Sequence, residues 1–504
     1  MSRVAGARPG EGERRMRQST RRRRRRSLLA LGLVVAVGAL TGAARPRDGF
    51  DRRSGRLESA LIEAVSAQHF DQVVDFGPVE GACPGSSWCP PKAPTIAHTP
   101  NIDLAVIALD RRGRPRAAAD LLVSRDYPDG IGVSIGDDLG TDDVRWRRWN
   151  PDRWNGGTFS DKDGSRTTTV GWKDNPPLTA ADDIVPGREK APIEFMAPYP
   201  ASTFKLLVAF HTLRLVDRGT IDLDRDYRYD PPGGPAITRT TRELLDKMIT
   251  ESDNDSAKAL IKQLHDLGEI DHLNAGLRDL DLGTLQVNGT DPASGANWGI
   301  GQITMTSLDT ARLLLLVNGG RGVLWRTAGG KPVRADVLSP DARGLFLGLL
   351  ADQGWNDILT TSNWCGRSYP TAGIPSLVAD RWVDPGTGTV SVADKAFGQD
   401  VRPCNDRAEV SFAHKTGFTY NYLADAGIVR SLNGEDGARG YGGAPQGDYI
   451  VVMMSNLGYR YSDPRQAAVA QPVCGDDPGQ DEGVCYTEKF AALGRAVDDI
   501  LRRR

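Results

Sequence analysis

The stretch "PASTFKLLVAF", residues 200–210, places a serine and a lysine three positions apart at the start of an apolar, helix-like run. On a helix, side chains with this spacing lie on the same face within contact range. Serine is a weak nucleophile that must lose its proton to a neighbouring base. Lys205 could be that base for Ser202, because an apolar surrounding lowers the pKa of an ammonium group. The plainer interpretation of Ser202 is a surface serine or a helix cap.

Two further triplets favour the catalytic interpretation. "SDN", residues 252–254, lies between two predicted helices, and "KTG", residues 415–417, ends a predicted strand. Each triplet alone is typical of a cap or a turn. In this order, after the Ser-x-x-Lys stretch, they match the motifs of serine β-lactamases and penicillin-binding proteins.

The chain resembles the class A β-lactamases and the related D,D-peptidases, most closely over residues 102–110 and 194–460. "PASTFKLLVAFHTL" is similar to the nucleophile helix of that family, and "LLDKMITESDNDSAKALI" to its second-motif segment. "HKTGFTYNYLADAGIV" is similar to its third-motif strand and the strand that follows. The resemblance implies an α+β fold, with an antiparallel sheet flanked by helices and an all-helical subdomain that carries the nucleophile. It implies no metal and no cofactor.

The resemblance also assigns catalytic roles to four polar side chains. Ser202 would be the nucleophile, and Lys205 its base or proton relay. Ser252 would pass a proton to the leaving nitrogen. Asn254 would hydrogen-bond Lys205 or the substrate amide. These roles supply the base and the proton relay that acyl transfer needs.

The third motif would recognise the substrate. Lys415 would supply positive charge for Ser252 and for the substrate carboxylate, which Thr416 would bind, with Gly417 completing the motif. The backbone N–H groups of Ser202 and Phe418 would form the oxyanion hole. Such donors stabilise the charge that develops in the transition state.

One segment departs from the family pattern. Class A enzymes hydrolyse the acyl-enzyme with water activated by a loop glutamate. The corresponding stretch, "LQVNGTDPASGANWGIGQ" at 285–302, contains no glutamate. Asp291 is its only carboxylate, and Gly295 occupies the position where an asparagine is expected. Asp291 is therefore either the deacylation base, one methylene shorter, or a turn aspartate. Arg430 is a further candidate for binding the substrate carboxylate.

The N-terminus predicts export. Arg21–Arg26 precede the uncharged run 27–44, which ends in small residues. This order is typical of a cleaved export signal, possibly of the twin-arginine type, so we expect a secreted or extracytoplasmic protein. An uncleaved anchor helix that attaches the protein to a membrane is the alternative.

The six cysteines agree with export, because an exported chain meets an oxidising environment. Local closure predicts three pairs: Cys83–Cys89, Cys365–Cys404 and Cys474–Cys485. A zinc site is the weaker interpretation, since none of these spacings is CxxC.

The charge balance argues against nucleic acid as a partner. Beyond residue 44 the chain has 52 basic and 63 acidic residues, a net charge of −11. An acidic protein is a poor candidate for binding phosphate backbones.

Periodicity gives the same architecture as the resemblance. Strands are expected at 102–110, 409–418, 423–431 and 448–456. Helices are expected at 56–70, 201–218, 241–249, 255–267, 306–317, 340–353 and 487–504. A helical block between strands far apart in sequence predicts an α+β arrangement, with helices packed against one sheet.

We predict three segments: an export signal at 1–44, an N-terminal helix and disulfide loop at 45–100, and a hydrolase domain at 101–504. Two insertions are expected in the hydrolase domain, at about 125–190 and 359–410. The first contains Trp146, Trp149 and Trp154 among arginines. Such a cluster binds a polymer or, on the favoured interpretation, pins a small fold together.

These observations leave three hypotheses about function. The favoured one is an exported, monomeric serine hydrolase of the class A β-lactamase type, which opens β-lactam rings through an acyl-serine. The alternative is a D-alanyl-D-alanine carboxypeptidase or transpeptidase that acts on cell-wall peptides. The third is a non-catalytic cell-wall-binding protein. The intact set of three motifs argues against the third.

Overall fold

The computed structural model describes residues 48–75, 95–96, 98–150, 179–365, 372–419, 421–432, 447–458, 461–463 and 488–502. The chain divides into two units, Met1–Pro46 and Arg47–Arg504, and all described residues lie in the second. The predicted export signal and the predicted pairs Cys83–Cys89 and Cys474–Cys485 lie outside the described residues. None of the described helices is both long and apolar enough to cross a membrane.

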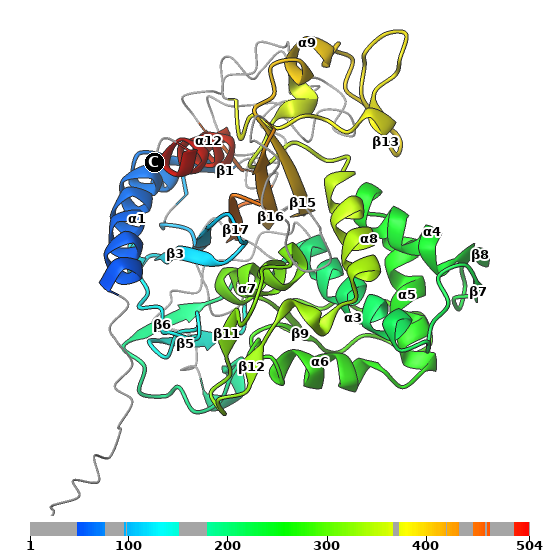
Figure 1. The fold of residues 1–504 in the computed structure, drawn as a ribbon, viewed down its shortest axis with the longest axis horizontal. Coiled ribbons are helices and arrows are strands. Elements are labelled where there is room, and N and C mark those ends of the chain that lie inside the picture. Colours follow the sequence, from blue (N-terminus) through cyan, green and yellow to red (C-terminus); the bar gives the residue numbers. More distant parts are fainter. Residues whose placement is uncertain are drawn as a thin grey trace, which may run out of the picture. The chain divides into compact units, whose positions relative to one another are not determined.

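The centre of the fold is a six-stranded antiparallel sheet with the order β15-β16-β17-β2-β3-β4 (Figure 1). Its strands are β2 (Ile102–Leu109), β3 (Pro115–Val123), β4 (Ile131–Gly132), β15 (Val410–Phe418), β16 (Leu423–Ser431) and β17 (Tyr449–Ser455). β17 pairs with β2, so strands from the N-terminal and C-terminal parts of the chain are neighbours in the sheet. The pairing runs from Tyr449 opposite Ala108 to Ser455 opposite Ile102. β15 is an edge strand, so one of its sides is free to face the helices.

Short strand pairs surround this sheet. They are β1 (Val74–Asp75) with β18 (Tyr461–Ser462), β5 (Val144–Arg147) with β6 (Ile193–Met196), β7 (Asp226–Tyr229) with β8 (Ile237–Thr240), β9 (Gln286–Val287) with β10 (Ile303–Thr304), β11 (Trp325–Arg326) with β12 (Pro332–Val333), and β13 (Ser391–Val392) with β14 (Lys395–Ala396). The helical part of the fold thus also carries the hairpins β7–β8 and β9–β10.

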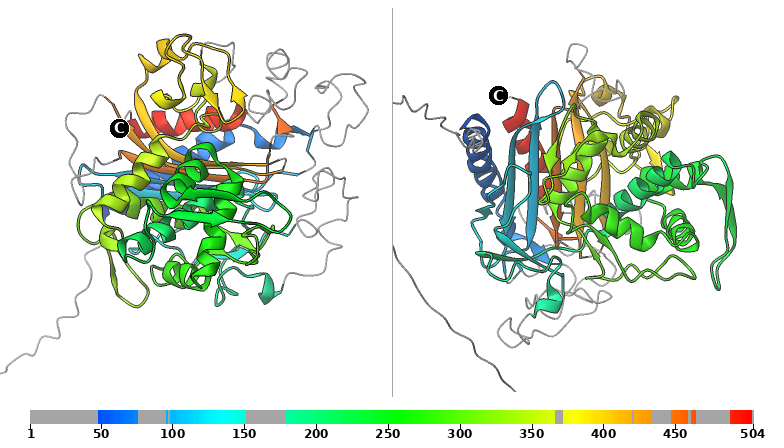
Figure 2. Two further views of the ribbon diagram at one scale, coloured as in Figure 1. Left: turned by 90° about the vertical axis from the view of Figure 1, so that its right-hand side faces the viewer. Right: turned by 60° about the horizontal axis from the view of Figure 1, so that its bottom comes forward.

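The helices cover both faces of the sheet (Figure 2). They are α1 (Asp48–Ser66), α3 (Lys205–Asp217), α4 (Thr241–Asp246), α5 (Asn254–Asp266), α6 (Ile270–Arg278), α7 (Ser307–Asn318), α8 (Pro340–Ala351), α9 (Arg402–Asn405) and α12 (Glu488–Arg502). On one face of the sheet, α1 packs against β3 and also contacts α12. On the other face, α7 packs against β2, β16 and β17. α8 contacts β15 and α3, which brings the helical block to the edge strand.

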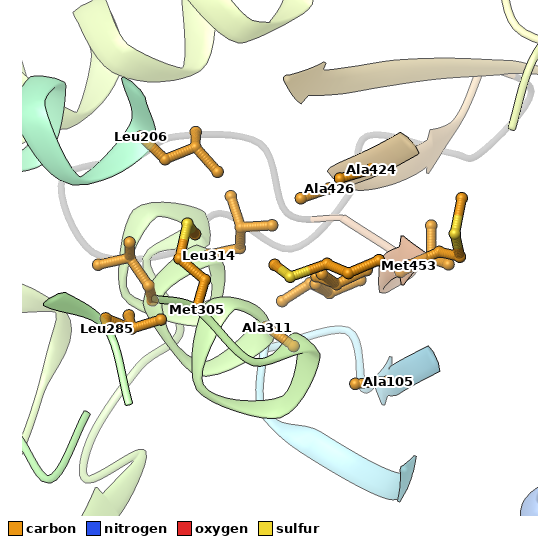
Figure 3. Packing of buried hydrophobic residues seen from close by; sticks show 14 of the residues in the cluster. Ala105, Leu206, Leu285, Met305, Ala311, Leu314, Ala424, Ala426 and Met453 are labelled. Carbon is orange, nitrogen blue, oxygen red and sulfur yellow. The ribbon is translucent and has the colours of Figure 1, made fainter. Parts of the chain in front are cut away.

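α7 explains how the two layers fit together. All of its residues are buried, which is typical of a helix inside the core rather than on a surface. Figure 3 shows Leu314 of this helix and Met453 of β17 in the same packed cluster as the small residues Ala105, Ala311 and Ala424. Alanines on the sheet and on the helix allow the backbones to approach closely. Each large apolar side chain buried here contributes about 1.5–3 kcal/mol.

Most predicted elements are confirmed, and the differences have local causes. α1 begins at Asp48 instead of residue 56, because its charged first turns face solvent while Phe50 is buried. The predicted helix 201–218 begins as the 3-10 helix Ala201–Phe204 before α3. The predicted helix 241–249 becomes α4 followed by a π-helical turn, Lys247–Glu251. α6 was not predicted.

The described part of the first predicted insertion is a small packed unit. β5 and β6 pair in parallel, and their apolar side chains form a cluster that includes Trp146 and Phe195. Trp149 is also buried, against Tyr422. These burials favour the pinned fold over a polymer-binding surface, while Trp154 lies outside the described residues.

The second predicted insertion contains a disulfide. The predicted bond Cys365–Cys404 is present and spans 39 positions. Val390, Val392 and Phe397 inside it, and Trp364 directly before it, belong to a separate apolar cluster.

Candidate active site

The nucleophile candidate Ser202 lies in a strained turn. Ala201, directly before it, has a φ of 47°, which non-glycine residues rarely adopt. The 3-10 helix Ala201–Phe204 then leads into α3, whose first residue is Lys205. Ser202 itself is half-buried, whereas Ala201 before it and Lys205 after it are buried. Strain of this kind often marks functional sites, because the surrounding fold must hold it in place.

Lys205 is completely buried at the start of α3, at 0% exposure. Its Nζ donates to Ser252 O at 2.6 Å, to Asn254 Oδ1 at 2.7 Å and to Ser252 Oγ at 3.3 Å. Burial lowers the pKa of Lys205 to about 7, although Asp253 opposes the shift. A large share of Lys205 is therefore an uncharged amine at neutral pH, as a general base must be.

The second motif is presented by a π-helical turn. After Lys247–Glu251 the backbone reverses at Ser252, whose φ is 60°. Asp253 then caps α5 by accepting from the N–H groups of Asp255 and Ser256. Asn254 is the first residue of α5. The π-turn and the cap together turn Ser252 and Asn254 toward Lys205, which bonds both.

Lys415 reaches the same serine from the sheet. Its Nζ donates to Ser252 Oγ at 2.9 Å and to Thr416 O at 2.8 Å. Burial, and then the charge of Lys205, lower the pKa of Lys415 well below its usual range. Ser252 Oγ thus lies between two buried amines, Lys205 of α3 and Lys415 of β15. Ser252 and Lys415 are 163 positions apart in sequence.

The rest of the third motif lies against the nucleophile turn. Thr416 Oγ1 is buried and has no hydrogen-bond partner among the described residues. A Cβ at Gly417 would lie 2.6 Å from Pro200 O and 2.7 Å from Thr203 N. Only glycine therefore lets β15 pass this close to the turn before Ser202. Phe418 follows, half-buried, with its ring 5.8 Å from that of Trp355.

The structure gives Asp291 the contacts of a turn aspartate. Its carboxylate accepts from Ser294 Oγ at 2.5 Å and from Ala293 N at 3.0 Å, and these bonds lower its pKa. Its role as a deacylation base stays a prediction. Gly295 has a φ of 66°, and a Cβ there would lie 2.0 Å from Lys258 O of α5. Packing against α5 therefore excludes the expected asparagine at this position.

Arg430, the further candidate for the substrate carboxylate, lies on β16 opposite Ser411. That register position is four residues before Lys415 along β15. The structure therefore does not bring Arg430 together with the third motif at the end of β15.

Two tryptophans at the site were missed in the sequence. The Trp298 ring lies 5.1 Å from the ring of Phe204 and 5.8 Å from Lys205 Nζ. Trp355 donates from Nε1 to Glu251 O at 2.7 Å, directly before Ser252. Both side chains are half-buried. A lone tryptophan in a loop is a weak signal, and only the fold reveals what these two contact.

The arrangement provides the parts for acyl transfer. It combines a serine at a strained helix start, a buried amine with a lowered pKa, a second serine as relay and a second cation. Within the described residues, no cluster of three or more His, Cys, Asp or Glu side chains could hold a metal ion.

Comparison with known proteins identifies one matching family. The model of the β-lactamase enzyme family matches residues 197–438, a range that contains all three motifs. No curated protein matches the sequence significantly.

Several solved structures are similar at low identity. A class A β-lactamase from Bacteroides cellulosilyticus DSM 14838 is 13% identical, covers 89% of this chain and 99% of that chain, and has a TM-score of 0.42. A β-lactamase from Sphaerobacter thermophilus DSM 20745 is also 13% identical, with 88% and 98% covered and a TM-score of 0.39. PBP-A is 19% identical, with 61% and 82% covered and a TM-score of 0.35. These structures are too distant to support an argument about activity.

Proposed function

The chain belongs to the β-lactamase family of serine hydrolases, and from this premise we propose that it opens β-lactam rings through an acyl-enzyme on Ser202. The observation that carries the proposal is the bonding of Ser252 Oγ, which lies 3.3 Å from Lys205 Nζ and 2.9 Å from Lys415 Nζ. A hydroxyl between two amines can receive a proton from one side and deliver one to a substrate.

The proposed reaction gives each group a separate role, and Lys205 first takes a proton and later returns it. Ser202 Oγ attacks the lactam carbonyl carbon while uncharged Lys205 takes its proton. The backbone N–H groups of Ser202 and Phe418 hold the oxyanion. The C–N bond then breaks, and the ring nitrogen takes a proton from the Ser252 hydroxyl. Protonated Lys205 gives Ser252 a proton in return. Lys415 and Thr416 bind the substrate carboxylate, for which Thr416 Oγ1, without a partner among the described residues, is available.

Intact-mass spectrometry of the protein mixed with a penicillin tests the proposal, beside turnover of a chromogenic cephalosporin. We expect a covalent adduct on the wild type, none on Ser202→Ala, and an unchanged adduct on Ser59→Ala, which removes an exposed hydroxyl from α1. A transient adduct with rapid turnover supports a β-lactamase. An adduct that persists on Ser202→Ala, or no adduct and no turnover on the wild type, would contradict the proposal.

A second candidate function is a D-alanyl-D-alanine carboxypeptidase or transpeptidase. It is favoured by Asp291, whose carboxylate is engaged by Ser294 and Ala293 in its own turn. Without an effective base for water, the acyl-enzyme would persist. A stable adduct with little turnover would therefore favour this second candidate, and release of D-alanine from a cell-wall pentapeptide would establish it.

We also propose that the protein acts outside the cytoplasm as a monomer on small molecules or cell-wall peptides. Support comes from the arginine block and apolar run at 21–44 and from the bond Cys365–Cys404, since disulfides persist in oxidising compartments. The N-terminal sequence of protein recovered from the producing cells tests this. Cleavage near residue 44 supports export, and an intact N-terminus in the cytoplasm contradicts it.

A further inference from the structure

A cavity lies on the face of the sheet opposite the one that α7 covers. Its volume is about 540 Å³, and its lining comes from α1, the paired strands β2 and β3, and the last turn of α12. Figure 1 shows the C-terminal end of α12 beside α1. The size is usual for a small-molecule site. None of the lining residues takes part in the proposed acyl transfer, so this cavity is a separate feature of the molecule.

The floor of the cavity is apolar, because two small residues are paired there. Ala108 of β2 lies opposite Ala117 of β3, and both are buried. Leu57 of α1 and Leu501 of α12 complete the apolar part of the lining. Larger side chains at the two alanine positions would fill the space beneath the helices. The alanine pair therefore leaves an aliphatic depression, with no aromatic ring in its lining on which a base or a sugar could stack.

The polar part of the lining consists of three arginines, Arg53, Arg56 and Arg116. Arg53 Nε donates to Arg116 O at 2.8 Å, which fixes this side chain against β3. Among the described residues, the guanidinium groups of Arg56 and Arg116 have no hydrogen-bond or ion-pair partner. No aspartate or glutamate belongs to the lining. Because like charges repel one another, the cavity favours an anion.

This cluster is a local exception on an acidic protein. The chain beyond residue 44 has a net charge of −11. Other arginines near the surface have acidic partners: Arg242 lies 2.8 Å from Asp224, and Arg402 lies 2.8 Å from Asp400. The charge of the cavity is therefore not a consequence of a generally basic surface.

An anionic group attached to an aliphatic chain fits both parts of the lining. The fork of a guanidinium group matches the oxygens of phosphate, and a phosphate offers more acceptors to several arginines than a carboxylate does. Anionic phospholipids combine such a headgroup with aliphatic chains. Only residues 45–47 separate the uncharged run 27–44 from Asp48, the first residue of α1. The predicted export would bring this end of the chain to a membrane, whose anionic lipids attract arginines.

We propose that the cavity binds an anionic phospholipid, with the phosphate on the three arginines and the first methylene groups of a chain over Ala108 and Ala117. The bound lipid holds the protein at a membrane surface through a face that carries none of the three motifs. This inference is independent of the proposed function, because it uses no residue of the candidate active site.

Isothermal titration calorimetry with a short-chain phosphatidylglycerol that dissolves as a monomer tests the proposal, on the protein as it is recovered from the producing cells. Short-chain phosphatidylcholine has the same chains but carries a choline cation, which the arginines repel. Inorganic phosphate has no chain. We expect phosphatidylglycerol to bind about tenfold more tightly than either of the other probes. Equal affinity for the two lipids, affinity for phosphate as high as for phosphatidylglycerol, or no binding of phosphatidylglycerol would overturn the inference.

A matched pair of triple variants locates the binding. Arg53→Gln, Arg56→Gln and Arg116→Gln together should weaken phosphatidylglycerol binding about tenfold or more. Arg218→Gln, Arg225→Gln and Arg228→Gln together remove three exposed arginines of the helical block and change the net charge equally. This control should bind like the wild type. An equal loss in both variants, or no loss in the first, contradicts the proposed site.

Ala117→Leu tests the apolar floor by filling it. This variant should bind phosphatidylglycerol more weakly and inorganic phosphate as the wild type does, because the arginines are unchanged. An unchanged affinity for phosphatidylglycerol would show that the chain does not lie over the alanine pair. If the first triple variant or Ala117→Leu fails to fold, Arg56→Gln decides, since this exposed side chain has no described partner to lose. Unchanged binding in Arg56→Gln would then overturn the inference.

Discussion

The active site and the interior between β2, β3 and α7 both bury ionisable groups, but they partner them differently. In the site, Lys205 and Lys415 each donate to neutral oxygens, and burial turns them toward uncharged amines. Under α7, two carboxyl groups of adjacent strands, Asp103 and Asp120, lie against one another, and both are completely buried. Burial raises the pKa of Asp103 to about 6 and that of Asp120 well above its usual range.

The comparison shows that burial alone does not make a reactive group. Both regions disfavour the charged form of their side chains. In the site the result is an amine with a lowered pKa, three positions from a serine that follows a strained residue. Between β2 and β3 the result is a carboxyl pair that retains a proton and faces Ser307 N, which donates to Asp103 Oδ2 at 2.8 Å. The orientation of neighbouring polar groups decides whether the burial serves chemistry or packing.

The largest effect is expected from Lys205→Met. Removing the buried amine should lower the rate of penicillin acylation by about a thousandfold, because Ser202 loses its general base. Stopped-flow mixing with quench and mass detection measures this rate. Lys262→Met, which removes a partly exposed lysine of α5, is the control and should acylate normally. A loss of less than tenfold in Lys205→Met would show that the amine is not the base.

The pH dependence of acylation tests the same group without a mutation. The uncharged amine predominates above the Lys205 pKa of about 7 and the protonated form below it. The acylation rate should therefore rise with pH through about 7 and fall about tenfold per unit below it. Rates measured from pH 5 to 8 check this. A flat profile over that range would contradict the base role.

Asp120→Asn should act on stability instead of activity. The folded-state pKa of both acids is raised, so folding favours their protonated forms, and wild-type stability should fall as pH rises from about 4 through 6. The variant should raise the free energy of unfolding at pH 7 by about 1–3 kcal/mol and flatten this slope. Urea unfolding from pH 4 to 8 measures both. Asp230→Asn, at an exposed position, is the control, and a destabilised Asp120→Asn would refute the shared-proton picture.

The smallest effect is expected from Trp298→Ala. Its ring shields Lys205, so its loss should admit water and raise the acid-side midpoint of acylation by a few tenths of a pH unit. The pH profile of the variant measures this shift. A midpoint that moves down, or that stays fixed while KM rises, would assign Trp298 to substrate contact instead.

The sequence predicted the parts of the site that are local. Ser202 and Lys205 are three positions apart, and Ser252 and Asn254 lie in one triplet, so both pairs could be recognised as motifs from the sequence. Trp298 and Trp355 were not found, because the residues that they contact, Phe204 and Glu251, are distant in sequence. α6 was missed because it is only nine residues long, so its apolar face at Ile270, Leu273 and Leu277 repeats over little more than two turns.

For the fold, individual strands could be predicted from the sequence, but their order in the sheet could not. The strands β2 and β17 are almost continuously apolar, and a sheet buried on both faces requires such runs. The order of those strands depends on the pairing of β17 with β2, which no local pattern announces. The sequence of the loop around Asp291 does not explain why residue 295 is a glycine. The structure does, because a Cβ at this position would overlap the backbone of Lys258.

The φ of 47° at Ala201 has a consequence for how this chain would evolve. Glycine adopts such a backbone at little cost, so Ala201→Gly would relieve about 1 kcal/mol of strain next to Ser202. A laboratory population selected only for survival of heat would therefore gain from that exchange. If the proposed function holds, a population selected on a β-lactam would keep the methyl group that restricts the turn before Ser202. The two selections would therefore favour different residues at position 201.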